Sequence, residues 1–263
     1  MNLFWPVFEN LVMPFIAGMF YFFLARYIAY IAPLRKLVTG DITYKGAFWG
    51  FIFFGLFLLT RPLQIALGPH PLPLIMNDIR EFIMIGLFAP AVFVGLTSFA
   101  LGFENIRKQT VLLVFGLGIA LAVAFCVVNK SAIGGSMEIF KIGAYSFYDG
   151  KWFDPSNPDA HLMPILFIIR VTDPVLLMIM LGIFCFWRAI VFPKNSVYDN
   201  MPVKLVFQGL AVMSFGLSML FTGFMAVIWK IPNQWWIYYL GAILAGVFES
   251  VSLSFPLHKE QKI

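Results

Sequence analysis

The sequence contains seven apolar segments, each long enough to cross the hydrocarbon core of a membrane. A helix needs about 20 apolar residues to span a core of about 30 Å. Inside lipid only helices and closed barrels satisfy the backbone, and these segments lack the alternation of barrel strands. We therefore predict an all-α, polytopic membrane protein with seven transmembrane helices in a single domain, residues 1–263. The predicted helices cover residues 6–32, 46–67, 79–102, 110–129, 162–190, 203–229 and 233–254.

The composition supports lipid as the main solvent of this chain. Hydrophobic residues make up 61% of it and charged residues 12%, whereas an average soluble domain has about 25% charged residues. Residues 1–10 lack the basic region of a signal peptide, so we expect the first segment to be retained as a helix. The lysines and arginines form no long basic cluster, so we expect no nucleic-acid partner.

The distribution of basic residues predicts the orientation. The loops after the first, third and fifth segments are rich in basic residues, among them Arg35, Lys36, Arg107, Lys194 and Lys204. The loop at 130–161 lies on the opposite side and offsets its lysines with acidic residues. The positive-inside rule then places the N-terminus outside and the C-terminus in the cytoplasm. We expect a multi-pass protein of the bacterial inner membrane with an ordered, aromatic-rich outer loop at 130–161.

Several charges lie close to the apolar segments, above all in "RPLQIALGPHPLPLIMNDIREF". An ionisable residue in such a place marks a functional site or a paired structural contact. The prolines of "GPHPLPL" predict a non-helical connector, either re-entrant or lying at the membrane interface, and non-helical backbone beside converging charges is typical of a membrane ligand site. We predict a ligand site at the outer side formed by Arg61, His70, Asp78, Arg80, Glu81, Arg170 and Asp173.

Simpler explanations exist for the same residues. Arg61 and Arg80 are also placed to extend their charged ends to the membrane surface. Arg170 and Asp173 lie three residues apart on one helix face, so they can form a self-contained ion pair that only fixes helix packing. Glu249, near the inner end of the seventh segment, is expected to pair with Arg26 or with a loop lysine, or else to belong to a proton path.

Other chemistry is not supported by the sequence. His70 and His161 have no ligand at metal-site spacing, and the apolar segments contain no histidine for a haem, so we expect no metal and no cofactor. Cys126 and Cys185 lie within apolar segments and are typical of small core residues. There is no GxSxG, HExxH or Walker motif, so no catalytic residue is predicted and the chain is not expected to be an enzyme.

The segment "TRPLQIALGPHPLPLIMNDIREF", followed by "APAVFVGL" in a seven-segment layout, resembles the integral-membrane sensor modules of bacterial signalling proteins. The resemblance implies a seven-helix bundle that passes a signal to a cytoplasmic output domain such as a kinase. Only "PLHKEQKI" follows the seventh segment here. The resemblance therefore implies that the signal passes to a separate protein, or that the output half is absent from this chain.

Three functions follow from these features. The first is a membrane sensor or regulatory protein that binds a ligand or partner at the outer polar site. The alternatives are a structural or anchoring subunit of a larger membrane complex, and a transporter of small molecules or ions. A transporter would need polar residues at several depths along one route. The middle of most segments contains almost no polar residue, which counts against a transporter. Expected partners are the lipid bilayer and other membrane or cytoplasmic subunits.

Overall fold

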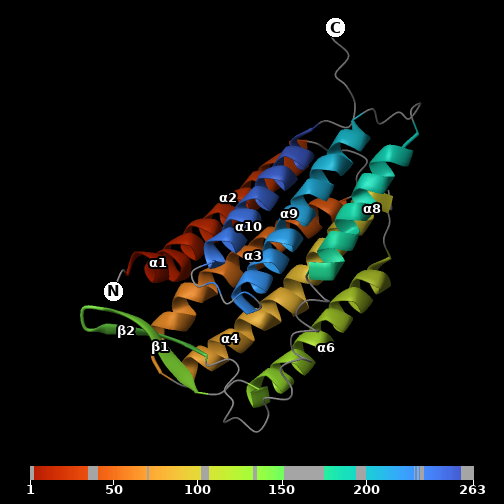
Figure 1. The fold of residues 1–263 in the computed structure, drawn as a ribbon. Coiled ribbons are helices and arrows are strands. Elements are labelled where there is room, and N and C mark those ends of the chain that lie inside the picture. Colours follow the sequence, from red (N-terminus) through yellow and green to blue (C-terminus); the bar gives the residue numbers. More distant parts are fainter. Residues whose placement is uncertain are drawn as a thin grey trace.

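Long helices and one β-hairpin make up the described part of the chain (Figure 1). The computed structural model describes residues 3–34, 41–69, 71–101, 107–132, 135–150, 175–193, 200–227, 229, 231 and 234–255. The helices are α1 (Phe4–Val7), α2 (Met13–Leu34), α3 (Asp41–Ala66), α4 (Leu72–Phe82), α5 (Ala89–Leu101), α6 (Lys108–Ala132), α8 (Leu177–Val191), α9 (Met201–Val227) and α10 (Trp235–Ser254). Two π-helical turns, η1 (Phe8–Val12) and η2 (Ile83–Phe88), join α1 to α2 and α4 to α5.

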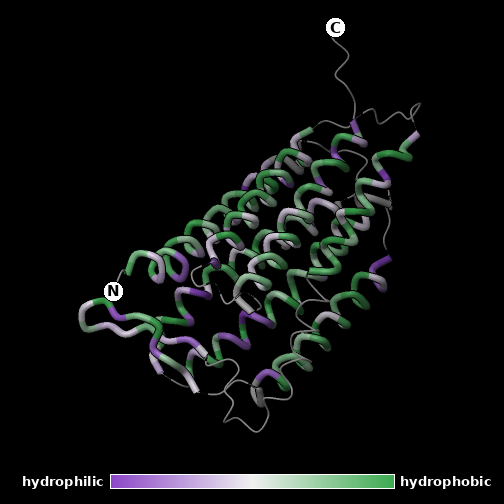
Figure 2. The backbone as a smooth tube through the Cα atoms, in the orientation of Figure 1, coloured by the Kyte–Doolittle hydropathy of each residue, from purple (hydrophilic) through white to green (hydrophobic). Residues whose placement is uncertain are grey.

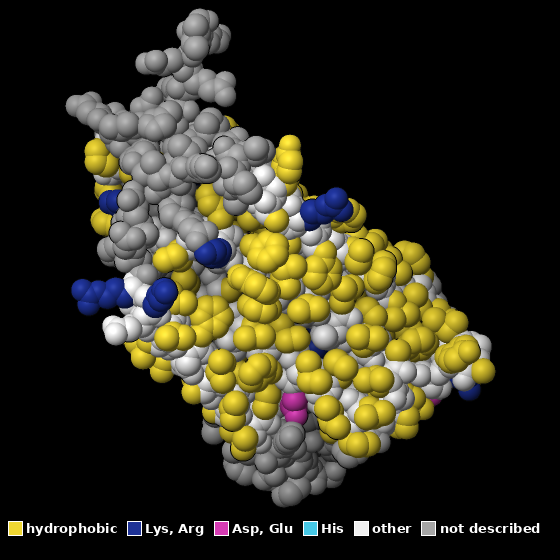
Figure 3. Space-filling view, turned by 180° about the vertical axis from the view of Figure 1, so that it is seen from behind, with side chains coloured by type: hydrophobic (Ala, Val, Ile, Leu, Met, Phe, Trp, Pro, Cys, Tyr) yellow, Lys and Arg dark blue, Asp and Glu magenta, His cyan; other side chains and the backbone are white. Residues whose placement is uncertain are grey.

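The helices have the length and composition of a multi-pass membrane protein, as predicted. Six described helical stretches are long and apolar enough to cross a membrane, and Leu177–Val191 is a shorter apolar helix. Figure 2 shows hydrophobic residues along the helices and hydrophilic ones gathered toward their ends. The face in Figure 3 is covered mostly by hydrophobic side chains, as expected of a surface that contacts lipid. The fifth predicted segment is described only from residue 175, so the count of seven stays a prediction.

The helices pack in two groups. One group contains α2, α3, α4, α5 and α6, and the other contains α8, α9 and α10, with α10 also packed against α2. One end of the bundle, here called the hairpin end, carries α1, the end of α3, the start of α4, the start of α10 and the hairpin (Figure 1). The opposite end carries the start of α6, the end of α8 and the start of α9. Which end faces the cytoplasm stays a prediction.

The antiparallel hairpin lies within the predicted outer loop. It consists of β1 (Ser136–Ile142) and β2 (Tyr145–Gly150), with Gly143 at positive φ in the turn. Phe140 is buried and stacks on Phe147 of the opposite strand, with ring centroids 4.7 Å apart. Residues 135–150 of the predicted loop form this hairpin, residues 151–161 lie outside the described residues, and the position of the loop on the outer side stays a prediction.

The connector between α3 and α4 is shorter than predicted. Helix α4 begins at Leu72, with Pro71 as its N-cap and Pro73 in its first turn. Proline is tolerated there because N–H groups of the first turn have no intrahelical partner. The prediction that "GPHPLPL" is non-helical is therefore wrong for Leu72–Leu74, and the predicted start of the third helix at residue 79 is too late. Gly68, at φ +89°, turns the chain before α4.

Aromatic rings fill the middle of the bundle. The ring of Phe54 lies 4.7 Å from that of Phe88, 4.9 Å from that of Phe215 and 4.7 Å from that of Tyr21, measured between centroids. These rings come from both helix groups, so they join the two groups at mid-depth. In the described part of the chain, these packed aromatic side chains lie between the two ends of the bundle.

Lys204 is not the loop residue that the sequence predicted. It lies in the first turn of α9 and is only 1% exposed. Its Nζ donates hydrogen bonds to the backbone oxygens of Ser252 and Phe255, both at 2.8 Å. The last carbonyls of a helix have no intrahelical donors and carry the negative end of the helix dipole. Lys204 therefore caps α10 and is not a sign of membrane orientation.

Candidate functional site: an arginine cluster at the hairpin end

Polar side chains from four elements meet at the hairpin end. They come from η1, α3, α4 and β2, and we call them the arginine cluster: Asn10, Arg61, Gln64, Asn77, Arg80 and Asp149. Arg61 and Gln64 lie one helical turn apart on α3 and therefore share a face. The cluster lies beyond the aromatic layer, beside Phe57, whose ring centroid lies 4.9 Å from the guanidinium carbon of Arg80.

Arg61 uses its whole guanidinium group. Its Nε and Nη2 donate to Oδ1 of Asn10 at 3.1 and 2.6 Å, and its Nη1 donates to Oε1 of Gln64 at 3.0 Å. Nη2 also forms a salt bridge with Oδ2 of Asp149 at 2.9 Å. A planar fork of donors suits several fixed acceptors at once, which a lysine at this position would not satisfy.

Gln64 links the two arginines. Its Oε1 accepts from Nη1 of Arg61 and, at 2.7 Å, from Nη1 of Arg80. Its Nε2 donates to Oδ1 of Asp149 at 3.1 Å and lies 3.4 Å from Oδ1 of Asn77. Gln64 is only 1% exposed, so these contacts form away from competing water. Its position therefore fixes how Arg61 and Arg80 are aimed.

Asp149 brings the hairpin to the bundle. Burial alone would raise the pKa of its carboxyl group, but the charge of Arg61 and the hydrogen bonds from Arg61 and the Gly150 N–H lower the pKa below its ordinary value, with a smaller effect of Arg80. The Gly150 N–H donates to Oδ1 at 2.8 Å. The carboxylate is therefore the stable form at neutral pH, and it is held by donors from both the hairpin and the bundle.

Glu9 connects this region to α10. It is 3% exposed, lies in η1 next to Asn10 and accepts hydrogen bonds from the backbone N–H groups of Trp235 and Trp236. These N–H groups belong to the first turn of α10, where backbone N–H groups have no intrahelical acceptor. Helix α10 is thus capped by Glu9 at the hairpin end and by Lys204 at the other.

The structure brings together only some of the predicted ligand residues. Arg61 and Arg80 converge on Gln64, and Glu81 is buried on the same helix as Arg80. Asp78 instead contacts α6, where its Oδ1 accepts a hydrogen bond from Nδ2 of Asn129 at 2.9 Å. The remaining predicted residues, His70, Arg170 and Asp173, lie outside the described residues.

Sequence reasoning missed four members of the cluster. Gln64 could have been found, because it lies three residues after Arg61 and must share its helix face. Asn10 and Asn77 carry no charge and belong to no motif, so nothing in the sequence marked them as members of a polar site. Asp149 was noted as a loop charge, but its partner depends on how the hairpin folds back onto α3 and α4, which no local pattern specifies.

The cluster has the chemistry of an anion site. The Arg61 guanidinium group and the Gln64 amide N–H contact the Asp149 carboxylate, and the Arg80 guanidinium group donates to the same Gln64 side chain. Arginine recognises carboxylate and phosphate through paired N–H donors. Among the described residues, no group of histidine, cysteine, aspartate or glutamate side chains is arranged to hold a metal ion.

No protein-family model, curated protein or solved structure matches this chain.

Proposed function

We propose that this chain is an integral-membrane sensor or regulatory protein, and that the arginine cluster at the outer end of the bundle binds the carboxylate of its ligand. The observation that carries the proposal is the position of Asp149. Its two carboxylate oxygens contact Arg61 and Gln64 as those of a ligand would. Asp149 in this view occupies the site until a free anion replaces it.

The hairpin is well suited to be displaced. A two-stranded hairpin alone is marginally stable in water, so its position depends on contacts with the bundle. Among the described residues, the salt bridge between Arg61 and Asp149 is a charged contact between hairpin and helices. An anion that competes for Arg61 would weaken docking of the hairpin and so change the outer surface of the protein.

Helix α10 offers a route from the cluster to the opposite end. The field of Arg61 reaches Glu9, which caps the start of α10. Lys204 holds the end of the same helix on α9. A change in charge near Arg61 would alter the cap at one end of a single packed helix, and a partner protein at the other end could detect its displacement. This route supports a sensor more than a passive anchor.

Spin-label distances in the purified full chain in nanodiscs test the proposal. Labels at Tyr145→Cys and Leu63→Cys, with Cys126→Ala and Cys185→Ala, report how the exposed hairpin turn sits relative to α3. We expect one docked distance in chloride buffer and a second, longer one as succinate replaces chloride at constant ionic strength. Inorganic phosphate in a parallel titration shows whether the site prefers carboxylate.

Two variants define the outcomes. Arg61→Gln should give the longer distance without succinate, whereas Arg107→Gln, an exposed arginine at the opposite end, should behave like the parent protein. A spin-label distance in the parent protein that changes with neither succinate nor phosphate would contradict the proposal. Succinate uptake into liposomes would assign a transporter instead.

A further inference from the structure

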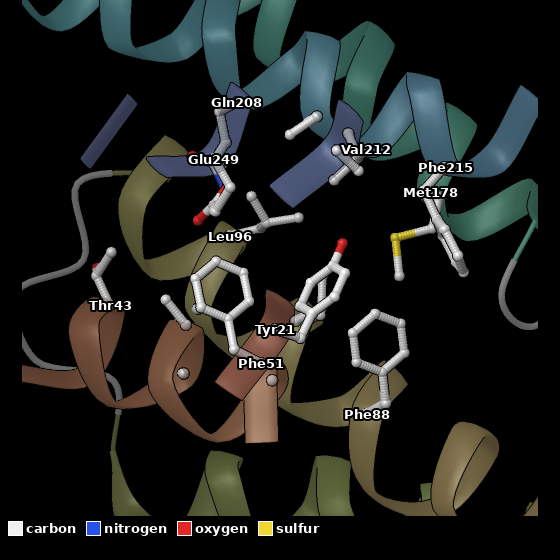
Figure 4. A pocket seen from close by; sticks show the side chains of 17 residues that line it. Tyr21, Thr43, Phe51, Phe88, Leu96, Met178, Gln208, Val212, Phe215 and Glu249 are labelled. Atoms are coloured by element: carbon white, nitrogen blue, oxygen red, sulfur yellow. The ribbon is translucent and has the colours of Figure 1, made fainter. Parts of the chain in front are cut away.

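A second candidate site lies in the other half of the bundle, away from the arginine cluster. A cavity of about 70 Å³ lies between α2, α3 and α5 on one side and α8, α9 and α10 on the other (Figure 4). Arg61, Asp78, Arg80 and Glu81, the predicted ligand residues within the described part of the chain, do not line it. The aromatic layer around Phe54 lies between this cavity and the arginine cluster.

The lining of the cavity is divided by polarity. Figure 4 shows Gln208 and Glu249 side by side at one end, whereas Met178, Phe88 and Phe215 lie toward the other. Between them lie mainly apolar side chains and Tyr21, whose hydroxyl group donates a hydrogen bond to the Ala242 carbonyl. A site with one polar end and an apolar body matches an amphipathic molecule and not a bare ion.

The polar end presents hydrogen-bond acceptors. Gln208 is 5% exposed, and its Oε1 accepts no hydrogen bond from any described residue. The amide of Gln208 hydrogen-bonds with the carboxyl group of Glu249, which also lies in the field of Lys204. The Lys204 ammonium group donates to the carbonyls at the end of α10. A buried amide oxygen without a donor loses free energy, so a ligand that supplies an N–H or O–H would be stabilised here.

Glycines create the space on the α3 side. A Cβ atom at Gly46 would lie 2.6 Å from the Cα of Gly95, so these two residues let α3 and α5 approach closely at the cavity wall. A Cβ at Gly50 would meet only Cγ2 of Val92, at 3.5 Å, which is an ordinary contact. Gly50 therefore borders open space that a larger side chain can fill.

We propose that this cavity binds a small amphipathic molecule with a short alkyl body and a hydrogen-bond-donating head group, an amine or a hydroxyl. The head group donates to Gln208 and Glu249, and the alkyl body extends toward Met178. The size of the cavity sets the length of the body. A cavity of about 150 Å³ holds a benzene ring, so a cavity of about 70 Å³ favours a chain of a few carbons.

Fluorine NMR of the full chain in nanodiscs tests the assignment, with 3-fluoropropylamine and 3-fluoropropanol as probes, which are both smaller than benzene. We expect saturable binding of at least one probe, beyond its partition into empty nanodiscs. Glu249→Gln should weaken binding of the amine probe about tenfold, the factor expected for losing a hydrogen bond to a charged group. Binding of the alcohol probe should weaken less. If Glu249→Gln weakens binding of both probes equally, the ligand would be assigned a neutral hydroxyl head group.

Filling variants separate the cavity from general membrane partition. Gly50→Leu should abolish the saturable signal, and Gly50→Ala, which fits without a clash, should reduce it if the leucine variant does not fold. Gly116→Leu adds the same side chain on the exposed face of α6 and should change nothing. Absence of saturable binding in the parent protein, or binding that persists in both Gly50 variants, would overturn the proposal. Neither outcome bears on succinate binding at Arg61.

Discussion

The Nη2 atom of Arg61 on α3 lies 2.9 Å from Oδ2 of Asp149 on the hairpin, although the two residues are far apart in the sequence. Both side chains are largely shielded from water, which strengthens the pair relative to one on an open surface. Gln64 contacts both partners and fixes their approach. This pair is a charged contact between the arginine cluster and the hairpin, and the proposed displacement of the hairpin would break it.

Removal of the charge on Asp149 should loosen the hairpin without unfolding the bundle. Asp149→Asn keeps the shape of the side chain but loses a charge-assisted hydrogen bond, worth about 2 kcal/mol. Hydrogen exchange in residues 136–150 should therefore accelerate about 30-fold. Glu138→Gln, an exposed change on the same hairpin, serves as the control and should leave the exchange rate unchanged. Equal protection in the two variants would show that other contacts hold the hairpin.

Docking of the hairpin should depend on pH in the acid range only. The pKa of Asp149 is lowered in the docked state from an ordinary value of 3.8, so its contribution is complete above that value and is lost as the pH falls through the lowered pKa. The spin-label distance between positions 145 and 63 should stay constant from neutral pH to about pH 5 and lengthen only in stronger acid. A transition near pH 7 would assign the control of docking to another group.

Loss of the cap on α10 should destabilise the far end of the bundle. Lys204→Met keeps most of the side-chain volume but removes two hydrogen bonds to backbone carbonyls. The expected cost is about 3 kcal/mol, because buried acceptors lose a charged donor. Thermal unfolding in detergent should show a clear drop in Tm, whereas Lys108→Met, an exposed lysine at the start of α6, should show little change. Similar values for the two variants would contradict the capping role.

Alanine should destabilise the protein at Gly46, where α3 and α5 approach closely, but not at Gly50, four residues further along α3. Gly46→Ala places a methyl group 2.6 Å from the backbone of Gly95, so the helices must separate, at a cost of about 1–3 kcal/mol. Gly50→Ala meets only Val92 at an ordinary distance and should be close to neutral. The measurement is the Tm of both variants in the same detergent. A neutral Gly46→Ala would mean that the helices adjust freely at this point.

The apolar segments could be predicted as helices because lipid leaves the backbone few alternatives. The start of α4 could not, since Pro71 and Pro73 signal a break as readily as a first turn. The proximity of Arg61 and Arg80 was foreseen only as a gathering of charges at one end. Their link through Gln64, and the arrival of Asp149 from the hairpin, depend on tertiary packing that no single segment encodes.

Lys204 and Glu9 illustrate the same limit. Each is a single ionisable residue next to an apolar segment, and the sequence suggested a loop position for Lys204. The structure places each at an end of α10, where its side chain contacts backbone groups that have no partner within the helix. Such long-range caps pair residues from different helices, so periodicity within one helix cannot reveal them.

Labelling of Tyr145 in intact cells tests the central claim most directly, namely that the hairpin and the arginine cluster lie at the outer end of the membrane bundle. Tyr145 is 76% exposed at the turn of the hairpin, and Tyr145→Cys in a Cys126→Ala, Cys185→Ala background offers one thiol. We predict that a membrane-impermeant maleimide labels this thiol in intact cells, and labels Lys108→Cys, at the opposite end, only after the cells are opened. Labelling of Tyr145→Cys only after the cells are opened would contradict the account.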